Sequence, residues 1–176
     1  MLVVSPPPIL TMILRDATPS DVSDLTEIAH EAKRHWNYPE AWIAVWSPEL
    51  SFEPESLTTM RVVLAEEHGR VEGFCGLTPG TARWQVEHLW IRPSAMGRGV
   101  GRMLFDDAVA YARCQGAAVL AIESDPHAEG FYLRMGATRV GAIAAPAEGD
   151  PNRSLPVLEL ALALGECYPV PPKQAG

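Results

Sequence analysis

The segment of residues 91–112, IRPSAMGRGVGRMLFDDAVAYA, decides the fold of this chain. It begins at the end of a strand-like run, passes glycines at positions 97, 99 and 101, and continues with apolar residues at helical spacing. Glycine lets the backbone adopt positive φ and lets a ligand approach without a Cβ in the way. Unpaired N–H groups at a helix N-terminus carry partial positive charge. We therefore expect a phosphate-binding loop here, with Arg98 and Arg102 adding charge at its rim.

The loop differs from the two common nucleotide loops. A GxGxxG fingerprint counted from Gly97 puts Arg102 in the place of the third glycine, and the loop does not follow the first strand of the chain. A GK[ST] triplet is absent from the sequence. A nucleotide-binding protein is therefore disfavoured, while a glycine-rich turn without a ligand stays open at this point.

Composition narrows the class of protein. The chain has 176 residues, of which 47% are hydrophobic, and a formal net charge of −8. The length and hydrophobic content fit one globular domain. The negative net charge provides no excess of positive charge for binding nucleic acid. No run reaches 18 apolar residues, so no membrane span is predicted, and the N-terminus lacks the basic start of a signal peptide. We expect a domain over 12–165, a disordered leader over 1–11 and a flexible tail over 166–176.

The three cysteines, at positions 75, 114 and 167, are far apart and none has zinc spacing. We therefore expect no metal site, buried thiols at Cys75 and Cys114, and a cytoplasmic location.

Periodicity and turn signals place the remaining elements. Thr18, Pro19 and Asp21 are typical of a helix start, and Asp125 with Pro126 suggests a second one. The order is strand, helix, a run of strands, then alternating strands and helices, which predicts a mixed α/β sheet flanked by helices. The expected segments are strands at 12–17, 82–91, 117–122, 138–144 and 155–163, a hairpin at 61–77, and helices after Thr18, at 101–114 and after Asp125.

A second sequence motif lies further along the chain and indicates a family. SDPHAEGFYLRMGATRVG, residues 124–141, carries the pattern A-x-x-F-Y-x-x-x-G at Ala128, Phe131, Tyr132 and Gly136. Together with the glycine loop it resembles the GNAT N-acetyltransferase superfamily. The resemblance implies a GNAT fold, with a mixed, mostly antiparallel central sheet splayed between its fourth and fifth strands and acetyl-CoA in the opening. Met96 departs from the family's usual Gln or Arg.

The resemblance also implies residues for acetyl transfer. Glu87, on the strand before the loop, is the expected general base, and His88 is its rival because an ordinary histidine pKa suits the task. Strand alternation puts Glu87 on the face of Leu89 and Ile91, so a bulge or a cleft must explain its position. Tyr132 is the expected acid for the thiolate. The implied cofactor residues are Leu89, Trp90, Ile91, Met96, Gly97, Arg98, Gly99, Val100, Gly101, Arg102, Asp125 and Tyr132.

The acceptor is expected to be a primary amine of a small molecule or a peptide. The stretch 33–46, KRHWNYPEAWIAVW, contains three tryptophans and a tyrosine that could surround it. The four-residue spacing of Trp42 and Trp46 favours core packing for Trp46, which leaves Trp36 and Tyr38 as possible site residues. Arg153 could bind an acceptor carboxylate, and a solvent-facing loop arginine is the alternative. A homodimer is implied by the family. The alternative function is a GNAT-like acyl-CoA-binding or sensing module without catalysis.

Overall fold

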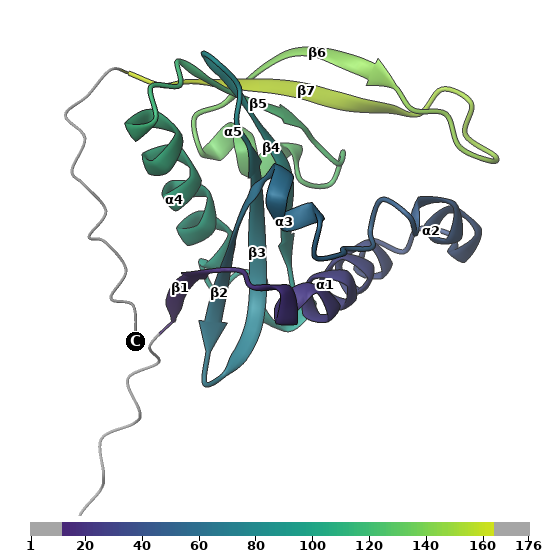
Figure 1. The fold of residues 1–176 in the computed structure, drawn as a ribbon. Helices are drawn as coiled ribbons and strands as arrows, with labels where there is room; N and C mark the ends of the chain where they lie inside the picture. The colour runs from purple at the N-terminus through teal and green to yellow at the C-terminus, as the bar shows by residue number, and fades with distance from the viewer. Residues whose placement is uncertain (1–11, 164–176) are drawn as a thin grey trace, which may run out of the picture.

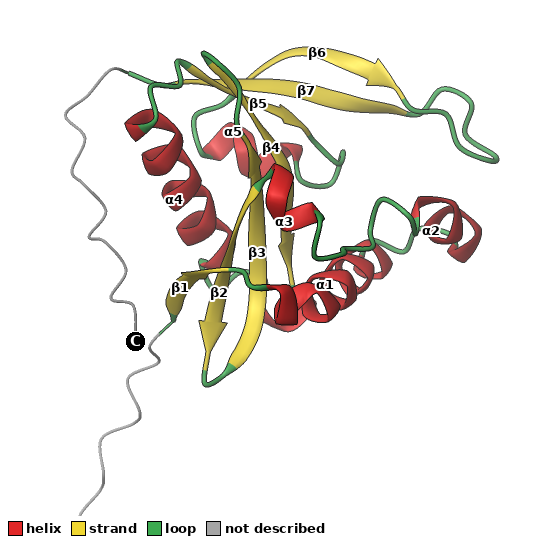
Figure 2. Ribbon diagram, in the orientation of Figure 1, coloured by secondary structure: helices red, strands yellow, loops and turns green. Residues whose placement is uncertain are grey.

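The computed structural model describes residues 12–163, which form one mixed sheet with helices on both faces (Figures 1 and 2). The strands are β1 (Ile13–Asp16), β2 (Arg61–Glu67), β3 (Arg70–Thr78), β4 (Arg83–Ile91), β5 (Val119–Glu123), β6 (Thr138–Ala144) and β7 (Ser154–Ala161). The helices are α1 (Val22–His35), α2 (Glu40–Trp46), α3 (Ser56–Thr59), α4 (Val100–Cys114) and α5 (Glu129–Arg134), with short 3-10 turns at Pro19–Asp21 and Pro93–Ala95. The leader 1–11 and the tail 166–176 lie outside the described residues.

The described strands are ordered β1-β2-β3-β4-β5-β7-β6, and β4–β5 is the parallel pair among antiparallel neighbours. The predicted mixed, mostly antiparallel sheet is confirmed. The α1 helix buries Leu25, Ile28 and Ala29 against one face, while α4 buries Leu104 and Phe105 against the other. Each helix therefore has its own apolar cluster across the sheet (Figure 1).

Local signals in the sequence are confirmed at two turns. The backbone N–H of Thr18 donates to the Asp21 carboxylate at 2.7 Å, which satisfies a free donor at the start of the first helical segment. The β2–β3 hairpin turns at His68 and Gly69, whose φ angles are 52° and 75°. Two consecutive positive φ angles are typical of the tight hairpin turn that matches the twist of the strands.

A β-bulge at Glu87 sets which side chains of β4 face which helix. Leu77 pairs with Val86 and Gly76 pairs with His88, so Glu87 has no partner in β3. This extra residue inverts the alternation, because Val86 and Leu89 both contact the α4-side cluster although they are three positions apart. The predicted bulge is therefore present, and it lies at Glu87 itself.

The sheet opens between β4 and β5. Their pairs run from Arg83–Val119 to Val86–Ile122. Residues 87–91 of β4 lie beyond the last pair, so one edge of this stretch has no strand beside it. The predicted splay between the fourth and fifth strands is confirmed, and the bulge stands where the strands separate.

Two expectations were wrong in detail. The helix expected after Asp125 begins at Glu129, because the Asp125 carboxylate is taken up by long-range contacts and residues 126–128 form a turn. Cys75 is a buried free thiol as expected, whereas Cys114 is disulfide-bonded. This disulfide removes one support for a reducing compartment. No helix among residues 12–163 is long and apolar enough to cross a membrane.

Candidate active site

A continuous cavity of about 920 Å³ enters the sheet where β4 and β5 separate. It extends from the glycine loop past β4 to α1, α2 and the connection between β6 and β7. Its lining includes Lys33, Trp36, Trp46, Glu49, Glu87, His88, Leu89, Trp90, Ile91, Met96, Gly97, Gly99, Gly101, Arg102, Glu123, Asp125, His127, Phe131, Tyr132, Arg134, Ala145 and Arg153. The cavity therefore brings together most of the predicted site residues.

The glycine loop forms the mouth of the cavity at the N-terminus of α4. Gly97 and Gly99 have φ angles of 76° and 86°, and a Cβ added at either would meet nothing within 4 Å. Positive φ requires glycine at both positions, and the open space lets a ligand reach the backbone. The free N–H groups of the first turn of α4 provide the expected electropositive cradle.

Arg98 and Val100 do not line the cavity. The Arg98 guanidinium contacts the Glu67 carboxylate at 2.5 Å, which links the glycine loop to the β2–β3 hairpin. The Val100 side chain is buried in the α4-side cluster. Arg102 remains at the exposed rim, and Arg134, which the sequence analysis missed, adds a second cation to the lining. Only its place in the last turn of α5, after the FY pair, could have indicated Arg134.

Glu87 lies on the wall of the cavity, exposed and at the bulge. Among the described residues it has no hydrogen-bond or ion-pair partner. Its carboxylate is therefore free to receive a proton from a ligand in the cavity.

His88 is a packed residue rather than a free base. Its ring lies 4.8 Å from that of Phe52 and accepts a 3.3 Å hydrogen bond at Nδ1 from Trp90 Nε1. Burial lowers the pKa of His88 to about 4. The imidazole is therefore neutral at pH 7 and weakly basic, which favours Glu87 in the choice between the two.

Tyr132 is 6% exposed and lines the cavity from α5. Its ring packs edge-on against Phe105 and Phe131, with centroids 5.5 and 5.1 Å apart. Burial raises the pKa of Tyr132 well above its usual range. The phenol therefore keeps its proton at physiological pH and is available as a hydrogen-bond or proton donor.

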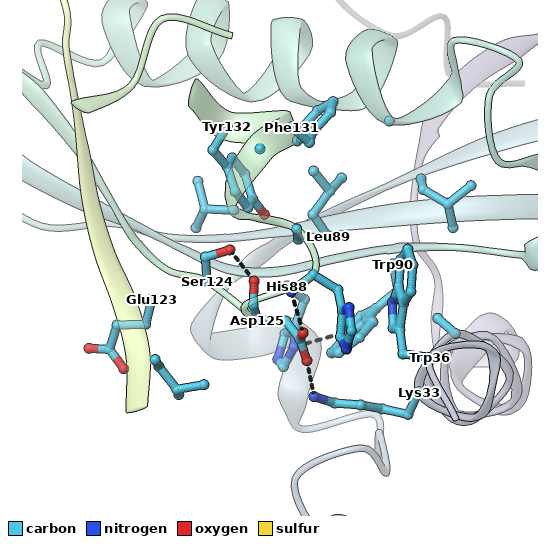
Figure 3. A pocket seen from close by; sticks show the side chains of 18 of the residues that line it. Lys33, Trp36, His88, Leu89, Trp90, Glu123, Ser124, Asp125, Phe131 and Tyr132 are labelled. Atoms are coloured by element: carbon cyan, nitrogen blue, oxygen red, sulfur yellow. Dashed lines mark hydrogen bonds and ion pairs between the residues drawn. The ribbon is translucent and has the colours of Figure 1, made fainter. Parts of the chain in front are cut away.

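Asp125 stands at the junction of the two halves of the cavity and is fully engaged there (Figure 3). Its Oδ2 accepts from Lys33 Nζ at 2.7 Å, and its Oδ1 accepts from the Tyr38 hydroxyl at 2.9 Å and the His127 N–H at 3.0 Å. Burial opposes ionisation of Asp125, but the Lys33 charge and these hydrogen bonds prevail and lower its pKa. Asp125 thus ties α1 to the loop after β5.

The aromatic side chains at the far end already contact cations of the protein. Lys33 Nζ lies 4.6 Å from the Trp46 ring centroid and 5.1 Å from that of Tyr38. Arg153 lies 4.8 Å from the Trp46 centroid. Tyr38 and Arg153 were predicted as possible acceptor-site residues, whereas Trp46 was expected in the core and instead lines the cavity. Lys33 was not predicted, because a lysine in the last turn of α1 is typical of a solvated helix end.

Comparison with known proteins identifies the class. The profile of the Acetyltransferase (GNAT) family matches residues 22–137, and the chain belongs to this family. Solved structures share the fold at low identity. The GCN5-related N-acetyltransferase from Rhodopseudomonas palustris has a TM-score of 0.72 and 20% identity to this chain. The match covers 88% of this chain and 98% of the Rhodopseudomonas chain.

Two further structures extend the likeness. The PaiA N-acetyltransferase from Thermoplasma acidophilum, in complex with coenzyme A, has a TM-score of 0.69 and 16% identity over 86% of this chain and 99% of its own. The ribosomal-protein-S18-alanine N-acetyltransferase from Escherichia coli has a TM-score of 0.68 and 12% identity over 89% and 97% of the two chains. At such identities the likeness concerns the fold.

Proposed function

We propose that the protein is an acetyl-CoA-dependent N-acetyltransferase that transfers acetyl directly to a primary amine of a small molecule or a peptide. One observation carries the proposal. A single cavity joins the glycine loop, the open edge of β4 and the unpartnered carboxylate of Glu87. Membership of the acetyltransferase family supports it.

The residues present fit coenzyme A. The pyrophosphate matches the open backbone of Gly97 and Gly99 at the N-terminus of α4, where it needs no side chain. Met96, in place of a polar residue, therefore leaves the main binding groups intact. Arg102 and Arg134 offer charge nearby, and the open edge of residues 87–91 offers backbone groups to the pantetheine arm and the thioester carbonyl.

The side chains divide the chemistry between them. Glu87 removes a proton from the acceptor ammonium, directly or through water, so that the neutral nitrogen attacks the acetyl carbonyl carbon. Backbone N–H groups near Leu89 stabilise the oxyanion that forms. When the C–S bond breaks, Tyr132 donates its proton to the departing thiolate. The amide and coenzyme A are the products, and the proton taken by Glu87 returns through solvent to Tyr132.

Calorimetric titration with acetyl-CoA tests the proposal, with NAD and ATP as comparison ligands. We expect saturable binding of acetyl-CoA that Gly99→Glu abolishes. Gly116→Glu is a matched control, because Gly116 has a φ of 84°, equally open surroundings, and a position outside the cavity lining. Loss of binding in both variants would indicate backbone strain instead of a cofactor contact.

A screen of amines with radiolabelled acetyl-CoA completes the test. Binding without transfer to any amine would support the non-catalytic acyl-CoA-binding module. Failure to bind acetyl-CoA would remove both functions. The homodimer and the cytoplasmic location stay predictions of the sequence analysis.

A further inference from the structure

Arg153 is a cation without a counter-ion on the cavity wall. It is half-buried and donates a 3.1 Å hydrogen bond to the backbone oxygen of Ala145. Within residues 12–163 no carboxylate lies within ion-pairing distance of its guanidinium. Most arginines of this acidic chain do have such a partner. Arg153 lines the cavity and has N–H donors beyond the one that binds Ala145.

The neighbouring charges do not neutralise Arg153. Lys33 and Asp125 form a 2.7 Å ion pair in which both side chains are almost buried, and the second Asp125 oxygen is used by Tyr38 and His127. The two opposite charges of this pair neutralise each other. Arg153 is therefore the cation beside these aromatic rings that has no carboxylate partner among the described residues.

The aromatic rings do not form an empty cage for a cation. The Trp46 ring makes cation–π contacts with both Lys33 and Arg153, and the Tyr38 ring makes one with Lys33. Trp36 is stacked on His127, with ring centroids 4.9 Å apart. A second ammonium group on the acceptor would meet the unpaired charge of Arg153 here, which costs free energy. The rings instead hold the Arg153 fork in place by stacking.

Carboxylates without an ion-pair partner also line the cavity. Glu87 and Glu49 line the cavity and have no ion-pair partner among the described residues. The cavity thus presents unpaired carboxylates and two guanidiniums without a carboxylate partner among the described residues, Arg134 in α5 and Arg153 beside the aromatic rings. This combination suits a ligand with both an ammonium and an anionic group. A planar guanidinium matches a carboxylate with two parallel N–H···O bonds.

A hydrogen bond bridges two elements at the aromatic end of the cavity. Trp42 Nε1 donates at 2.8 Å to the backbone oxygen of Glu148, joining α2 to the connection between β6 and β7. Ala145 and Arg153 from that connection line the cavity beneath this contact. The volume of about 920 Å³ must hold the coenzyme arm as well as the acceptor, so the remaining space suits a small molecule.

We propose that the acceptor is a small amino-acid-like amine whose carboxylate is bound by Arg153 while its amine faces Glu87. This inference rests on the proposed acetyltransferase function and names its substrate class. Arg153 is a specificity-determining residue in it, and the reaction itself is unchanged.

The test compares the L-amino acids with their L-amino-acid amides as acceptors at one fixed acetyl-CoA concentration. The amide has a less basic amine that is more often neutral, so chemistry alone favours the amide. We expect at least one amino acid to exceed its amide in kcat/KM by about 10- to 100-fold, the usual effect of a charged hydrogen bond. Arg153→Gln should remove this preference and leave the Kd for acetyl-CoA unchanged. Arg113→Gln, an exposed arginine outside the cavity, is the matched control.

The outcomes separate the two proposals. Acetylation of amides or diamines in preference to amino acids, or an equal loss for acid and amide in Arg153→Gln, would overturn the carboxylate site while leaving the acetyltransferase intact. An absence of acetyl-CoA binding would instead remove the proposed function. Arg153→Lys keeps the positive charge but loses the planar pair of N–H donors, so it should retain part of the preference for the amino acid. A retained preference would also show that a variant at this position still folds.

Discussion

At the scale of single residues, the bulge at Glu87 explains how a carboxylate comes to face the cavity from a strand whose neighbours are buried. With regular alternation Glu87 would lie with Leu89 against the α4-side cluster. The extra residue instead places Val86 and Leu89 on that side and leaves Glu87 exposed at the point where β5 diverges. The backbone bulge thus exposes this carboxylate to the cavity.

Replacing Glu87 by Gln removes the proposed base while keeping its shape. We expect kcat at pH 7 to fall by about 100- to 10,000-fold, with an unchanged Kd for acetyl-CoA. The defect should shrink as the pH rises toward the pKa of the amine, because the acceptor then loses its proton without help. Steady-state kinetics from pH 6.5 to 10 check this, with Glu55→Gln, an exposed glutamate outside the cavity, as control. A defect that is constant over this range would contradict the role of base.

The packed His88 gives the fold a specific sensitivity to acid. The pKa of its imidazole is about 4 in the folded protein and 6.5 in an unperturbed chain. The lowered pKa therefore favours unfolding as the pH falls through this window. The expected loss is up to about 3 kcal/mol between pH 7.5 and 4.

Urea denaturation at pH 7.5, 6 and 4.5 measures this loss. His88→Gln should show a flatter dependence on pH than the wild type, although its stability at pH 7.5 is lower. His68→Asn, a change at the exposed hairpin turn, should keep the wild-type slope. An unaltered slope in His88→Gln would assign the acid sensitivity to other groups.

At the scale of elements, the glycine loop is held by the hairpin beside it. Glu67, at the end of β2, is 8% exposed and pairs with Arg98 in the loop. This contact turns the Arg98 side chain away from the cavity and orients the backbone of Gly97 and Gly99 toward it. The arginine predicted to bind the cofactor thus acts as a positioning residue in our interpretation.

The two roles of Arg98 predict different results for its partner. If Arg98 positions the loop, Arg98→Met and Glu67→Gln should each raise the Kd for coenzyme A by about 2- to 5-fold, the usual size of a partly exposed ion pair. If Arg98 binds phosphate directly, only Arg98→Met should weaken binding. Calorimetry with coenzyme A on both variants, with Arg113→Met as control, decides between them.

At the scale of the whole molecule, the sheet consists of two parts that meet over four residue pairs of β4 and β5. The cavity occupies the opening between them, and its lining comes from both parts (Figure 3). A ligand bound there contacts β4 and α4 on one side and the β5–α5 loop on the other. Ligand binding is therefore expected to stabilise the junction itself.

Coenzyme A at 100 times its Kd should raise the free energy of unfolding by about 2.7 kcal/mol. Hydrogen exchange should slow in residues 87–91 and 123–132 together, since both border the opening. Gly99→Glu should show neither effect, and Gly116→Glu should show both. Protection confined to the glycine loop would contradict a ligand that spans the junction.

Much of this protein can be read from local signals. Glycine and proline act through their own backbone preferences, so the turns at Gly69, Gly97 and Gly99 could be predicted from the residues, and the period of apolar residues placed α1, α4 and the strands. Two short motifs indicated the family, and with it the predictions for Glu87 and Tyr132. These features depend on residues within a few positions of each other.

The partners of charged side chains could not be predicted in this way. Lys33 meets Asp125 across 92 positions of sequence, and Arg98 meets Glu67 across 31. Only the folded sheet brings them together. Asp125 therefore became an ion-pair partner rather than a helix cap, and Arg153 was left unpaired on the cavity wall. The sequence by itself determined the fold class and the glycine loop, because backbone preference and periodicity are local. The tertiary structure decided which charged groups at the aromatic end of the cavity are paired, because pairing depends on which distant groups share a buried space.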